Sequence, residues 1–220
     1  MISDLEWQPF HKEVMVDFLN YLNHYTDQFV LKGGTALMLC YGLDRFSEDI
    51  DLDCVKQDIK EHVRRFCEKH HFEFKIPKDT QTVKRCLIDY GNADHKLKVE
   101  VSYRNQAINT ARVDIIANIR VYSIDQLVKL KSFAYMGRDK IRDLYDLCFI
   151  AKRYYDVISD ESKSTISDVF SQKGIDQVEY LTNTQTDPLI NNEQLQYDFL
   201  EVYEKLGFEK PEIELAAPKL

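Results

Sequence analysis

The sequence predicts an α+β protein in which a mixed sheet flanked by helices is followed by a helical C-terminal region. Two observations lead to this prediction. Between residues 26 and 122, short segments of alternating apolar and polar residues recur between turns, as in β-strands. From residue 123 onward, apolar residues recur every three or four positions, as in helices. We therefore expect a core over residues 1–122 and a helical region over residues 123–220 that packs on it.

The first part of the chain is predicted to alternate helices with strands. A helix is expected over Trp7–Tyr25, because Val14, Phe18 and Leu22 are spaced at helical intervals. A strand running into a glycine turn, a short apolar helix, a second strand and another helix should follow; they are predicted in QFVLKGG, TALMLCYGL, EDIDLDCV and residues 57–71.

The next segments are predicted to extend the same sheet as a meander. Period-two alternation marks strands in FEFKI, TVKRCLIDY and HKLKVEVSY, and RVDIIANIRV is predicted to be one more strand. Ser123 and Gln126 then form a capping-box pattern that starts a helix. Gly137 separates this helix from a second one in RDKIRDLYDLCFIAKRYY, and the rest of the chain is expected to be mostly helical.

Composition favours a soluble protein with a sizeable core. The chain has 220 residues, of which 44% are hydrophobic, yet no segment approaches the ~20 apolar residues of a membrane-spanning helix. The start, MISDLEWQPF, lacks the features of a signal peptide. The five cysteines form no CxxC pair, which argues against a disulfide framework or a zinc site. We expect a cytoplasmic protein with no membrane partner.

Charge is unevenly distributed along the chain. The formal net charge is −8, but residues 1–153 carry +1 and residues 154–220 carry −9. An overall negative charge alone would argue against nucleic-acid binding, which depends on Lys and Arg. The acidic last third is either a solvated helical surface or a region that binds a partner.

The strongest chemical signal is the strand Asp49–Asp53. Alternation places Ile50 and Leu52 on one face and the carboxylates of Asp49, Asp51 and Asp53 on the other. Acids two positions apart are separated by ~6.7 Å along a strand, so their side chains can converge on a pair of divalent ions ~3.5–4 Å apart. Asp53 is too far from Asp49 to share these ions and is interpreted as a strand-end residue. In the alternative, the strand lies at a sheet edge and its acids face water.

A glycine turn precedes this strand. Lys32, Gly33, Gly34 and Thr35 close one strand and open a helix, an arrangement that lets backbone N–H groups and a helix N-terminus receive phosphate. A glycine pair alone is usually structural. Followed by an acid–apolar–acid strand, it indicates a phosphate-binding turn next to a metal-binding face.

The segment LKGGTALMLCYGLDRFSEDIDLD resembles the signature of the AbiEii/AbiGii toxin family, within the DNA polymerase beta-type nucleotidyltransferase superfamily. Gly33, Gly34 and Thr35 match the first part of the superfamily pattern, and Asp49–Asp51 matches the second. The run of Arg45, Ser47 and Glu48 resembles this family in particular. The resemblance implies a nucleotidyltransferase fold.

Two downstream elements are also similar to the family. Lys98–Val99–Glu100 matches the context of the family's third carboxylate; without the family, Glu100 would more often be an ordinary exposed strand residue. In the helical region, KSFAYMGRDKIRDLYDL resembles the family's later elements at Lys131, Arg138, Lys140, Arg142, Asp143 and Asp146. Arg142 and Asp146 form an i,i+4 pair, and so do Asp139 and Asp143. In the alternative, these charges stabilise the helix and have no direct part in the chemistry.

The resemblance implies an enzyme that transfers a nucleotide from an NTP to an acceptor hydroxyl. The expected catalytic residues are Asp49, Asp51, Glu100, Lys131 and Asp143. Asp49, Asp51 and Glu100 are expected to hold two Mg²⁺ ions. Nucleotide binding is assigned to Lys32, Gly33, Gly34, Thr35 and Arg138.

Members of the family act as toxins of type IV toxin–antitoxin or phage-defence systems, and some related toxins add nucleotides to the 3′ end of tRNA. We therefore expect an RNA acceptor, with tRNA as the leading candidate, and a cognate antitoxin as a partner. Two alternatives from other classes stay open: a small-molecule nucleotidyltransferase of the aminoglycoside-modifying kind, and a nucleotide-binding module without activity.

Overall fold

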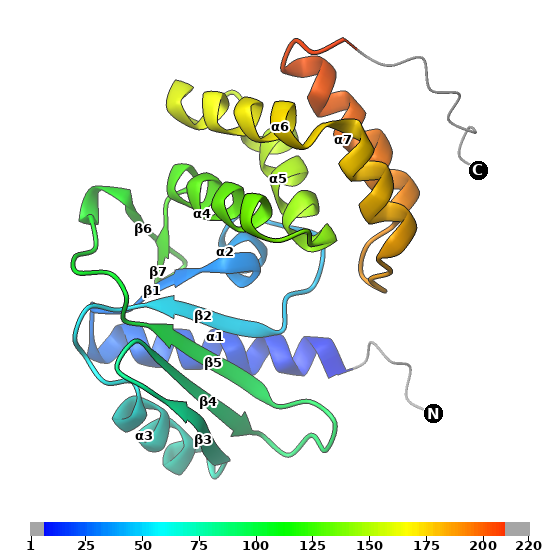
Figure 1. The fold of residues 1–220 in the computed structure, drawn as a ribbon. Coiled ribbons are helices and arrows are strands. Elements are labelled where there is room, and N and C mark those ends of the chain that lie inside the picture. Colours follow the sequence, from blue (N-terminus) through cyan, green and yellow to red (C-terminus); the bar gives the residue numbers. More distant parts are fainter. Residues whose placement is uncertain (1–6, 210–220) are drawn as a thin grey trace. The chain divides into compact units, whose positions relative to one another are not determined.

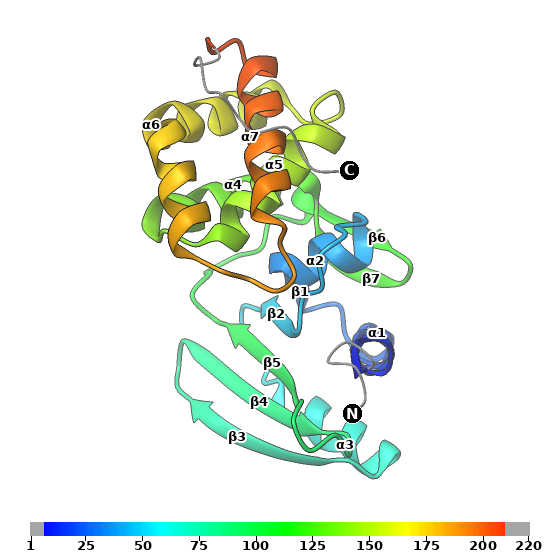
Figure 2. The ribbon, with the colours of Figure 1, turned by 90° about the vertical axis from the view of Figure 1, so that its right-hand side faces the viewer.

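The structure is a computed structural model that describes residues 7–209. Contacts within the chain divide it into two compact units, Met1–Ser123 and Ile124–Leu220. Figures 1 and 2 show the elements of each unit from two directions. The sheet belongs to the first unit, and the described part of the second unit is helical.

The first unit is built on a seven-stranded sheet in the order β3-β4-β5-β2-β1-β7-β6. Its strands are β1 (Val30–Lys32), β2 (Asp49–Asp53), β3 (Glu73–Asp79), β4 (Val83–Asp89), β5 (Leu97–Ser102), β6 (Val113–Ile116) and β7 (Ile119–Tyr122). Its helices are α1 (Trp7–Tyr25), α2 (Gly33–Cys40) and α3 (Lys60–His70), with a 3₁₀ turn at Thr110–Arg112. The β2/β5 and β1/β7 pairs are parallel and the others are antiparallel. The predicted mixed sheet is confirmed.

Strand β2 lies in the interior of the sheet, between β5 and β1. Ile50 and Leu52 are 0% and 1% exposed, as expected for the core-facing side of a strand with strict alternation. Because β2 has a neighbour on each side, the alternative in which its acids face water from a sheet edge is wrong. The acids instead lie on a face of the central sheet.

Helices α1 and α3 lie on the same side of the sheet (Figure 2). Phe66 of α3 contacts Phe18 and Tyr21 of α1, with ring centroids 5.2 and 5.4 Å apart. Phe18 and Phe66 are fully buried. Aromatic burial of this kind is a large contribution to a core, and here it fixes the two helices to each other.

The segment Arg112–Val121, predicted as one strand, contains two. β6 and β7 form an antiparallel hairpin in which Ile116 pairs with Ile119. The two residues between them, Ala117 and Asn118, have φ angles of 49° and 64°. A two-residue turn with both φ angles positive suits the twist of a hairpin, but it usually contains glycine. The alternation continues across this turn without the usual signal, so the sequence pattern reads as one strand.

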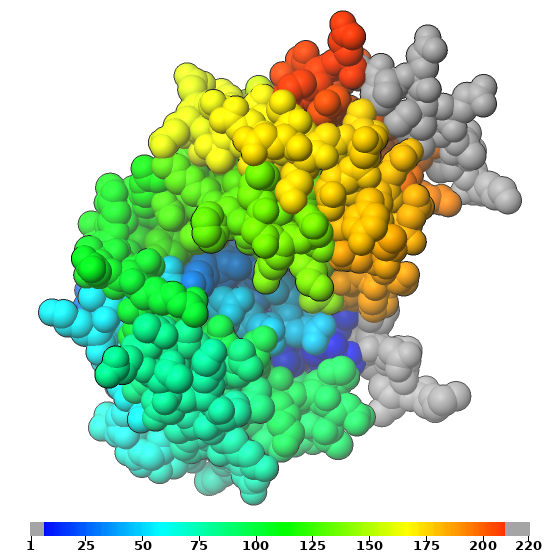
Figure 3. All heavy atoms as spheres, in the orientation of Figure 1, coloured from blue at the N-terminus to red at the C-terminus, as the bar shows by residue number. Residues whose placement is uncertain are grey.

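Strand β3 forms one edge of the sheet and is exposed along most of its length. Figure 3 shows the atoms of this segment, in teal, at the surface of the first unit. Pro77 lies within the strand, and the pairing register with β4 shifts between Lys75 and Lys78. Because proline lacks an N–H and the shift distorts the strand, this edge is a poor template for pairing with another strand.

The second unit consists of α4 (Ile124–Gly137), α5 (Ile141–Tyr154), α6 (Asp160–Thr184) and α7 (Asn192–Lys205). Its buried core includes Tyr135, Leu144, Phe170 and Phe199. Gly174 interrupts α6 with a φ angle of 64°. No helix within residues 7–209 is long and apolar enough to cross a membrane.

Candidate functional site

Three carboxylates share one face of the sheet in the first unit. Asp49 and Asp51 lie two positions apart on β2, and Glu100 lies on the neighbouring strand β5. The parallel register pairs Asp51 with Glu100 and Asp49 with Lys98. Adjacent strands are ~4.8 Å apart, so the register places the third acid beside the second.

Two cations on the same face neutralise two of these acids. Lys98 forms an ion pair with Asp49. Arg85 of β4 lies opposite Glu100 in the register and contacts its Oε2 through both Nε and Nη2 at 2.7 Å. Arg85 was not singled out by the sequence, because its position opposite Glu100 depends on the β4/β5 register.

Asp51 is the most confined of the three acids. Its burial raises the pKa of the carboxyl, and the nearby Asp49 charge raises it further, although Lys98 and Lys32 act in the opposite direction. An added positive charge nearby would stabilise the ionised form of this carboxyl.

Within residues 7–209, no three His, Cys, Asp or Glu side chains converge as the ligands of one metal ion. The donors on the acid face nevertheless fit a hard divalent cation by their chemistry, since all three are carboxylates. In the structure, Lys98 and Arg85 supply the positive charge that such an ion would bring.

The glycine turn packs directly against this face. Gly33 has a φ angle of +81°, and an added Cβ there would lie 3.1 Å from Oδ2 of Asp51. The positive φ favours glycine at this position, and a larger residue would press against the Asp51 carboxylate. At Gly34, an added Cβ would lie 2.8 Å from Nη2 of Arg45 and 2.9 Å from Oγ of Ser47. The glycine pair thus lets two neighbouring segments approach the start of α2.

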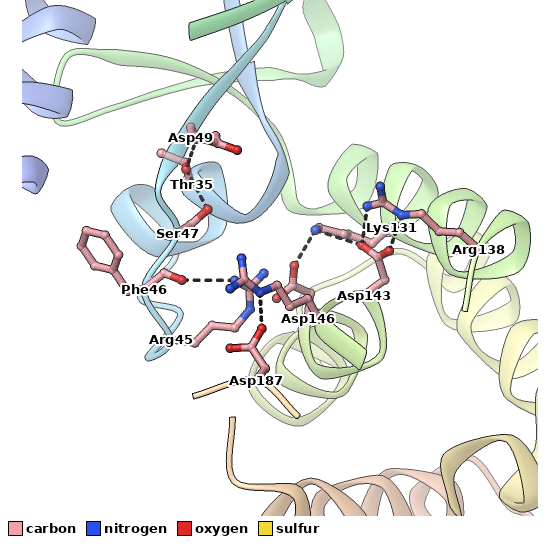
Figure 4. Close-up of polar contacts among 11 residues, drawn as sticks. Thr35, Arg45, Phe46, Ser47, Asp49, Lys131, Arg138, Asp143, Asp146 and Asp187 are labelled. Atoms are coloured by element: carbon pink, nitrogen blue, oxygen red, sulfur yellow. Dashed lines mark hydrogen bonds and ion pairs between the residues drawn. The ribbon is translucent and has the colours of Figure 1, made fainter. Parts of the chain in front are cut away.

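Thr35 ties α2 to the segment that leads into β2. Its side chain is buried, its hydroxyl donates to the backbone carbonyl of Asp49, and it lies 2.9 Å from Oγ of Ser47 (Figure 4). The backbone N–H of Ser47 also contacts the sulfur of Met38 in α2 at 3.3 Å. Thr35 therefore has a structural function, whatever it contacts in a substrate.

Asp53 belongs to a separate buried network. It is 2% exposed and forms an ion pair with Lys32, the residue to which the sequence assigned nucleotide binding. It also accepts hydrogen bonds from Nδ2 of Asn105 at 2.9 Å and from the hydroxyl of Tyr122 at 3.0 Å. Burial, the Asp53 charge and this hydrogen bond raise the pKa of Tyr122. Nothing local in the sequence marks Asn105 or Tyr122 as partners of Asp53.

The candidate residues of the second unit form their own cluster. Lys131 is 8% exposed and pairs with Asp146 at 2.5 Å and Asp143 at 3.5 Å. Arg138 contacts both oxygens of Asp143, through Nε at 2.7 Å and Nη2 at 3.1 Å (Figure 4). The structure therefore brings Lys131, Arg138 and Asp143 together, with Asp146 as a further member.

A pocket of about 620 Å³ adjoins this cluster within the second unit. It is lined by Arg138, Lys140, Ile141, Arg142, Asp143, Thr184, Gln185, Thr186 and Asp187. Gln185 fixes its wall, since its side chain accepts from the N–H of Ile141 and donates to the carbonyl of Asp139. The sequence alone did not point to residues 184–187, which lie far along the chain from α5.

Arg142 and Asp139, which i,i+4 spacing suggested as helix-stabilising charges, each contact a residue far along the chain. Nε of Arg142 contacts Asp187, and Asp139 contacts Lys173 at 2.8 Å. These contacts join α5 and the residues before it to α6 and to the segment that follows α6.

Family comparison agrees with the glycine turn and the acid strand. Residues 17–217 match the model of the AbiEii toxin, a nucleotidyl transferase of type IV toxin–antitoxin systems. The chain belongs to the AbiEii family. The AbiEii match includes both units and extends past the sequence signature in each direction.

Two solved structures from Helicobacter pylori are similar to this AbiEii chain. JHP933 is 32% identical, with a TM-score of 0.75 over 91% of this chain and 92% of JHP933. A second H. pylori protein, provisionally assigned as a nucleotidyltransferase, is 28% identical, with a TM-score of 0.73 over 91% of this chain and 95% of its own. No curated protein matches at a significant level. The AbiEii family and these folds identify the chain as a transferase that uses an NTP.

Proposed function

We propose that this AbiEii protein transfers NMP from an NTP to an acceptor hydroxyl in a Mg²⁺-dependent reaction. The observation that carries the proposal is the register of β2 with β5, which places Asp49, Asp51 and Glu100 on one face beside the Gly33–Gly34 turn. These three side chains would hold Mg²⁺, which supplies charge neutralisation and lowers the pKa of the acceptor hydroxyl.

The residues around the acids would position the triphosphate. The backbone of the Gly33–Gly34 turn, at the N-terminus of α2, is suited to receive phosphate oxygens. Lys98 and Arg85 neutralise Asp49 and Glu100 in the structure. With Mg²⁺ held by the carboxylates, Lys98 and Arg85 would be available to contact the triphosphate. Most of the rate enhancement would then come from positioning and charge stabilisation.

The Lys131 cluster would support the same reaction. Lys131 and Arg138 are the cations that we propose to offset charge on the triphosphate or on the departing pyrophosphate. Asp143 contacts both of them, so its part in the reaction would be to hold their side chains in place. Lys32 is engaged with Asp53, and we propose that it influences nucleotide binding through the charge it places near Asp51.

We propose that the acceptor is the 3′ end of an RNA, with tRNA as the leading candidate. The pocket of the second unit supports this, because Arg138, Lys140, Arg142 and two threonines line it. Two acids of the same lining, Asp143 and Asp187, pair with Arg138 and Arg142. Contacts between such basic side chains and phosphate groups would position a nucleic acid without reading its sequence. The cations of the pocket belong to residues 138–142, outside the stretch 154–220 that carries the acidic excess. NTPs and tRNA as substrates would place the activity in the cytoplasm.

The type IV family assignment supports a toxin with a cognate antitoxin.

A small-molecule acceptor is the competing proposal. Incubation of the protein with each α-labelled NTP, Mg²⁺ and either total tRNA or an aminoglycoside distinguishes the RNA acceptor from the small-molecule acceptor. Label in tRNA, absent with an Asp51→Asn variant and after chelation, is the expected result. Label that appears only in an added aminoglycoside would replace RNA with a small molecule, and no label in any acceptor would contradict nucleotidyl transfer.

A further inference from the structure

A buried histidine lies behind the acid strand. His11 is on α1, in the same buried stripe as Val14, Met15 and Phe18, and it is only 1% exposed. A polar ring at a core position needs hydrogen-bond partners for both nitrogens, because an unpaired buried polar group is costly. His11 has them.

Both hydrogen bonds of His11 are defined by chemistry. Nε2 lies 2.8 Å from the backbone carbonyl of Glu48, which can only accept, so Nε2 carries the proton. In the neutral ring Nδ1 is then an acceptor, and it receives the hydroxyl of Tyr90 at 2.6 Å. Burial lowers the pKa of His11, although the Glu48 carbonyl and nearby acids oppose this. The neutral ring in the Nε2–H tautomer satisfies both partners, and burial favours the neutral form.

Aromatic side chains hold the ring in place. Trp7, Phe46 and Tyr90 contact His11 edge to face, with centroids 5.0, 6.0 and 5.4 Å away. Trp7 belongs to α1, Phe46 to the segment before β2, and Tyr90 directly follows β4. The orientation of His11 is thus set by three parts of the first unit.

The carbonyl that His11 binds belongs to the peptide that joins Glu48 to Asp49. A shift of the backbone at this peptide would displace the Cα of Asp49, and it would break the bond to His11. The next peptide is held as well, because Thr35 donates to the carbonyl of Asp49. Successive peptides at the start of β2 are therefore fixed by two side chains from different helices.

We infer that His11 is a positioning residue, which holds the backbone at Asp49 so that this carboxylate faces the acid side of β2. This inference rests on the proposed function for its effect on catalysis. Its effect on the backbone can be measured without any reaction. His11 bonds to the Glu48 carbonyl and the Tyr90 hydroxyl, so its effect on Asp49 acts through the backbone.

The test compares His11→Leu with His11→Gln. Leucine fills the core but removes both hydrogen bonds, whereas glutamine keeps one donor and one acceptor. His24→Leu on the same helix is the control, since His24 is exposed and contacts Tyr25. For His11→Leu we expect kcat to fall about 100-fold with the KM for NTP within about twofold of wild type, as for a displaced catalytic group. His11→Gln should recover most of kcat.

Amide hydrogen exchange in a peptide spanning residues 47–53 is the second readout. Exchange should be faster in His11→Leu than in wild type and His24→Leu, and close to wild type in His11→Gln. If His11→Leu does not fold, Tyr90→Phe removes only the hydroxyl and should give a smaller change in both readouts.

Unchanged kcat and unchanged exchange in a folded His11→Leu or Tyr90→Phe variant would overturn the inference. Equal losses in His11→Leu and His11→Gln would do so too, because the role depends on the hydrogen bonds. If the wild type transfers no nucleotide, the proposed function fails, while the exchange data still decide whether His11 holds the strand.

Discussion

Asp51 of β2 lies directly opposite Glu100 of β5 in a parallel register. The two residues are far apart in the sequence, and their proximity follows from one strand pairing. It makes Asp51 the residue whose replacement should separate stability from activity most clearly.

Asp51→Asn should abolish nucleotidyl transfer and leave the free energy of unfolding unchanged or higher without metal. The folded-state pKa of Asp51 is raised above its unfolded value, mainly by burial. Ionisation therefore costs folding free energy as pH rises above about 3.9, the ordinary pKa of the unfolded side chain. Asparagine removes this cost at neutral pH. Urea unfolding and transfer assays with Asp94→Asn, an exposed loop acid, as control would check this. A folded Asp51→Asn variant with full activity would exclude Asp51 from the site.

Gly33→Ala should destabilise the protein more than Gly91→Ala. Both positions have positive φ angles, +81° and +91°, so alanine is strained at each by roughly 1–2 kcal/mol. At Gly33 the added methyl also approaches Asp51, whereas at Gly91 it meets nothing within 4 Å. Thermal unfolding of the two variants gives the difference, which should be absent if the Gly33 turn has no tight contact.

Gly34→Ala should weaken NTP binding, because the methyl group would displace Arg45 or Ser47 from the start of α2. Gly137→Ala is the matched control, since its φ is not strained and its added Cβ meets nothing within 4 Å. Calorimetric titration with NTP should show lower affinity for Gly34→Ala only. Equal affinities would mean that the turn accommodates the change without affecting nucleotide.

Lys131→Met should cost about 3–5 kcal/mol of folding stability, because it removes the cation from two buried carboxylates. Lys129→Met, in the exposed pair with Glu161, should cost about 0–1 kcal/mol. The Arg138 side chain is 62% exposed, and Lys131 stays beside Asp143 when Arg138 is replaced. Arg138→Gln should therefore cost less stability than Lys131→Met. A large loss of activity in Arg138→Gln would then point to contact with substrate, which unchanged transfer would argue against.

Lys140→Ala should reduce the salt dependence of tRNA binding. The slope of log affinity against log salt is negative. Each lost phosphate contact should make it shallower, by about 0.7 for a single strand and about 0.9 for a duplex. Lys140 is preferable to Arg142, whose replacement would also break the contact with Asp187. Lys205→Ala on the acidic helix α7 is the control. An unchanged slope for Lys140→Ala would remove this pocket from the RNA-binding surface.

His11 should make the protein less stable as pH falls. Its folded-state pKa lies below the ordinary value of 6.5, so the unfolded chain binds more protons and stability is lost progressively below about pH 6.5. His11→Gln should lessen this loss. Burial also lowers the pKa of His62, so the measured quantity is the difference between wild type and variant in urea unfolding across this range. The same pH dependence in both proteins would contradict a neutral buried His11.

Much of the fold follows from local periodicity. The alternation in residues 49–53 and 97–102 and the helical spacing in residues 7–25 agree closely with β2, β5 and α1. The β6/β7 hairpin was missed because Ala117 adopts a positive φ that its side chain does not favour. The surrounding strand pairing overrides that local preference.

The residues of the candidate site also fall into those that local sequence predicts and those that depend on distant contacts. Gly33, Gly34, Asp49 and Asp51 could be found from spacing, because the turn and the strand are close in sequence. The bond between Tyr122 and Asp53 and the contact between Arg142 and Asp187 depend on which distant segments the fold brings together. No periodicity within one segment reports such pairs.

The pairing of Leu31 with Val121 also constrains how the protein is made. β1 is buried and lies between β2 and β7, yet the ribosome synthesises β7 several seconds after β1 at ordinary elongation rates. Until residues 119–122 emerge, β1 has an unpaired edge and Asp53 lacks the Tyr122 hydroxyl. A nascent chain that stops before Ile119 therefore lacks β7, the neighbour of β1 in the sheet. The free edge of β1 is then a site at which another chain can pair.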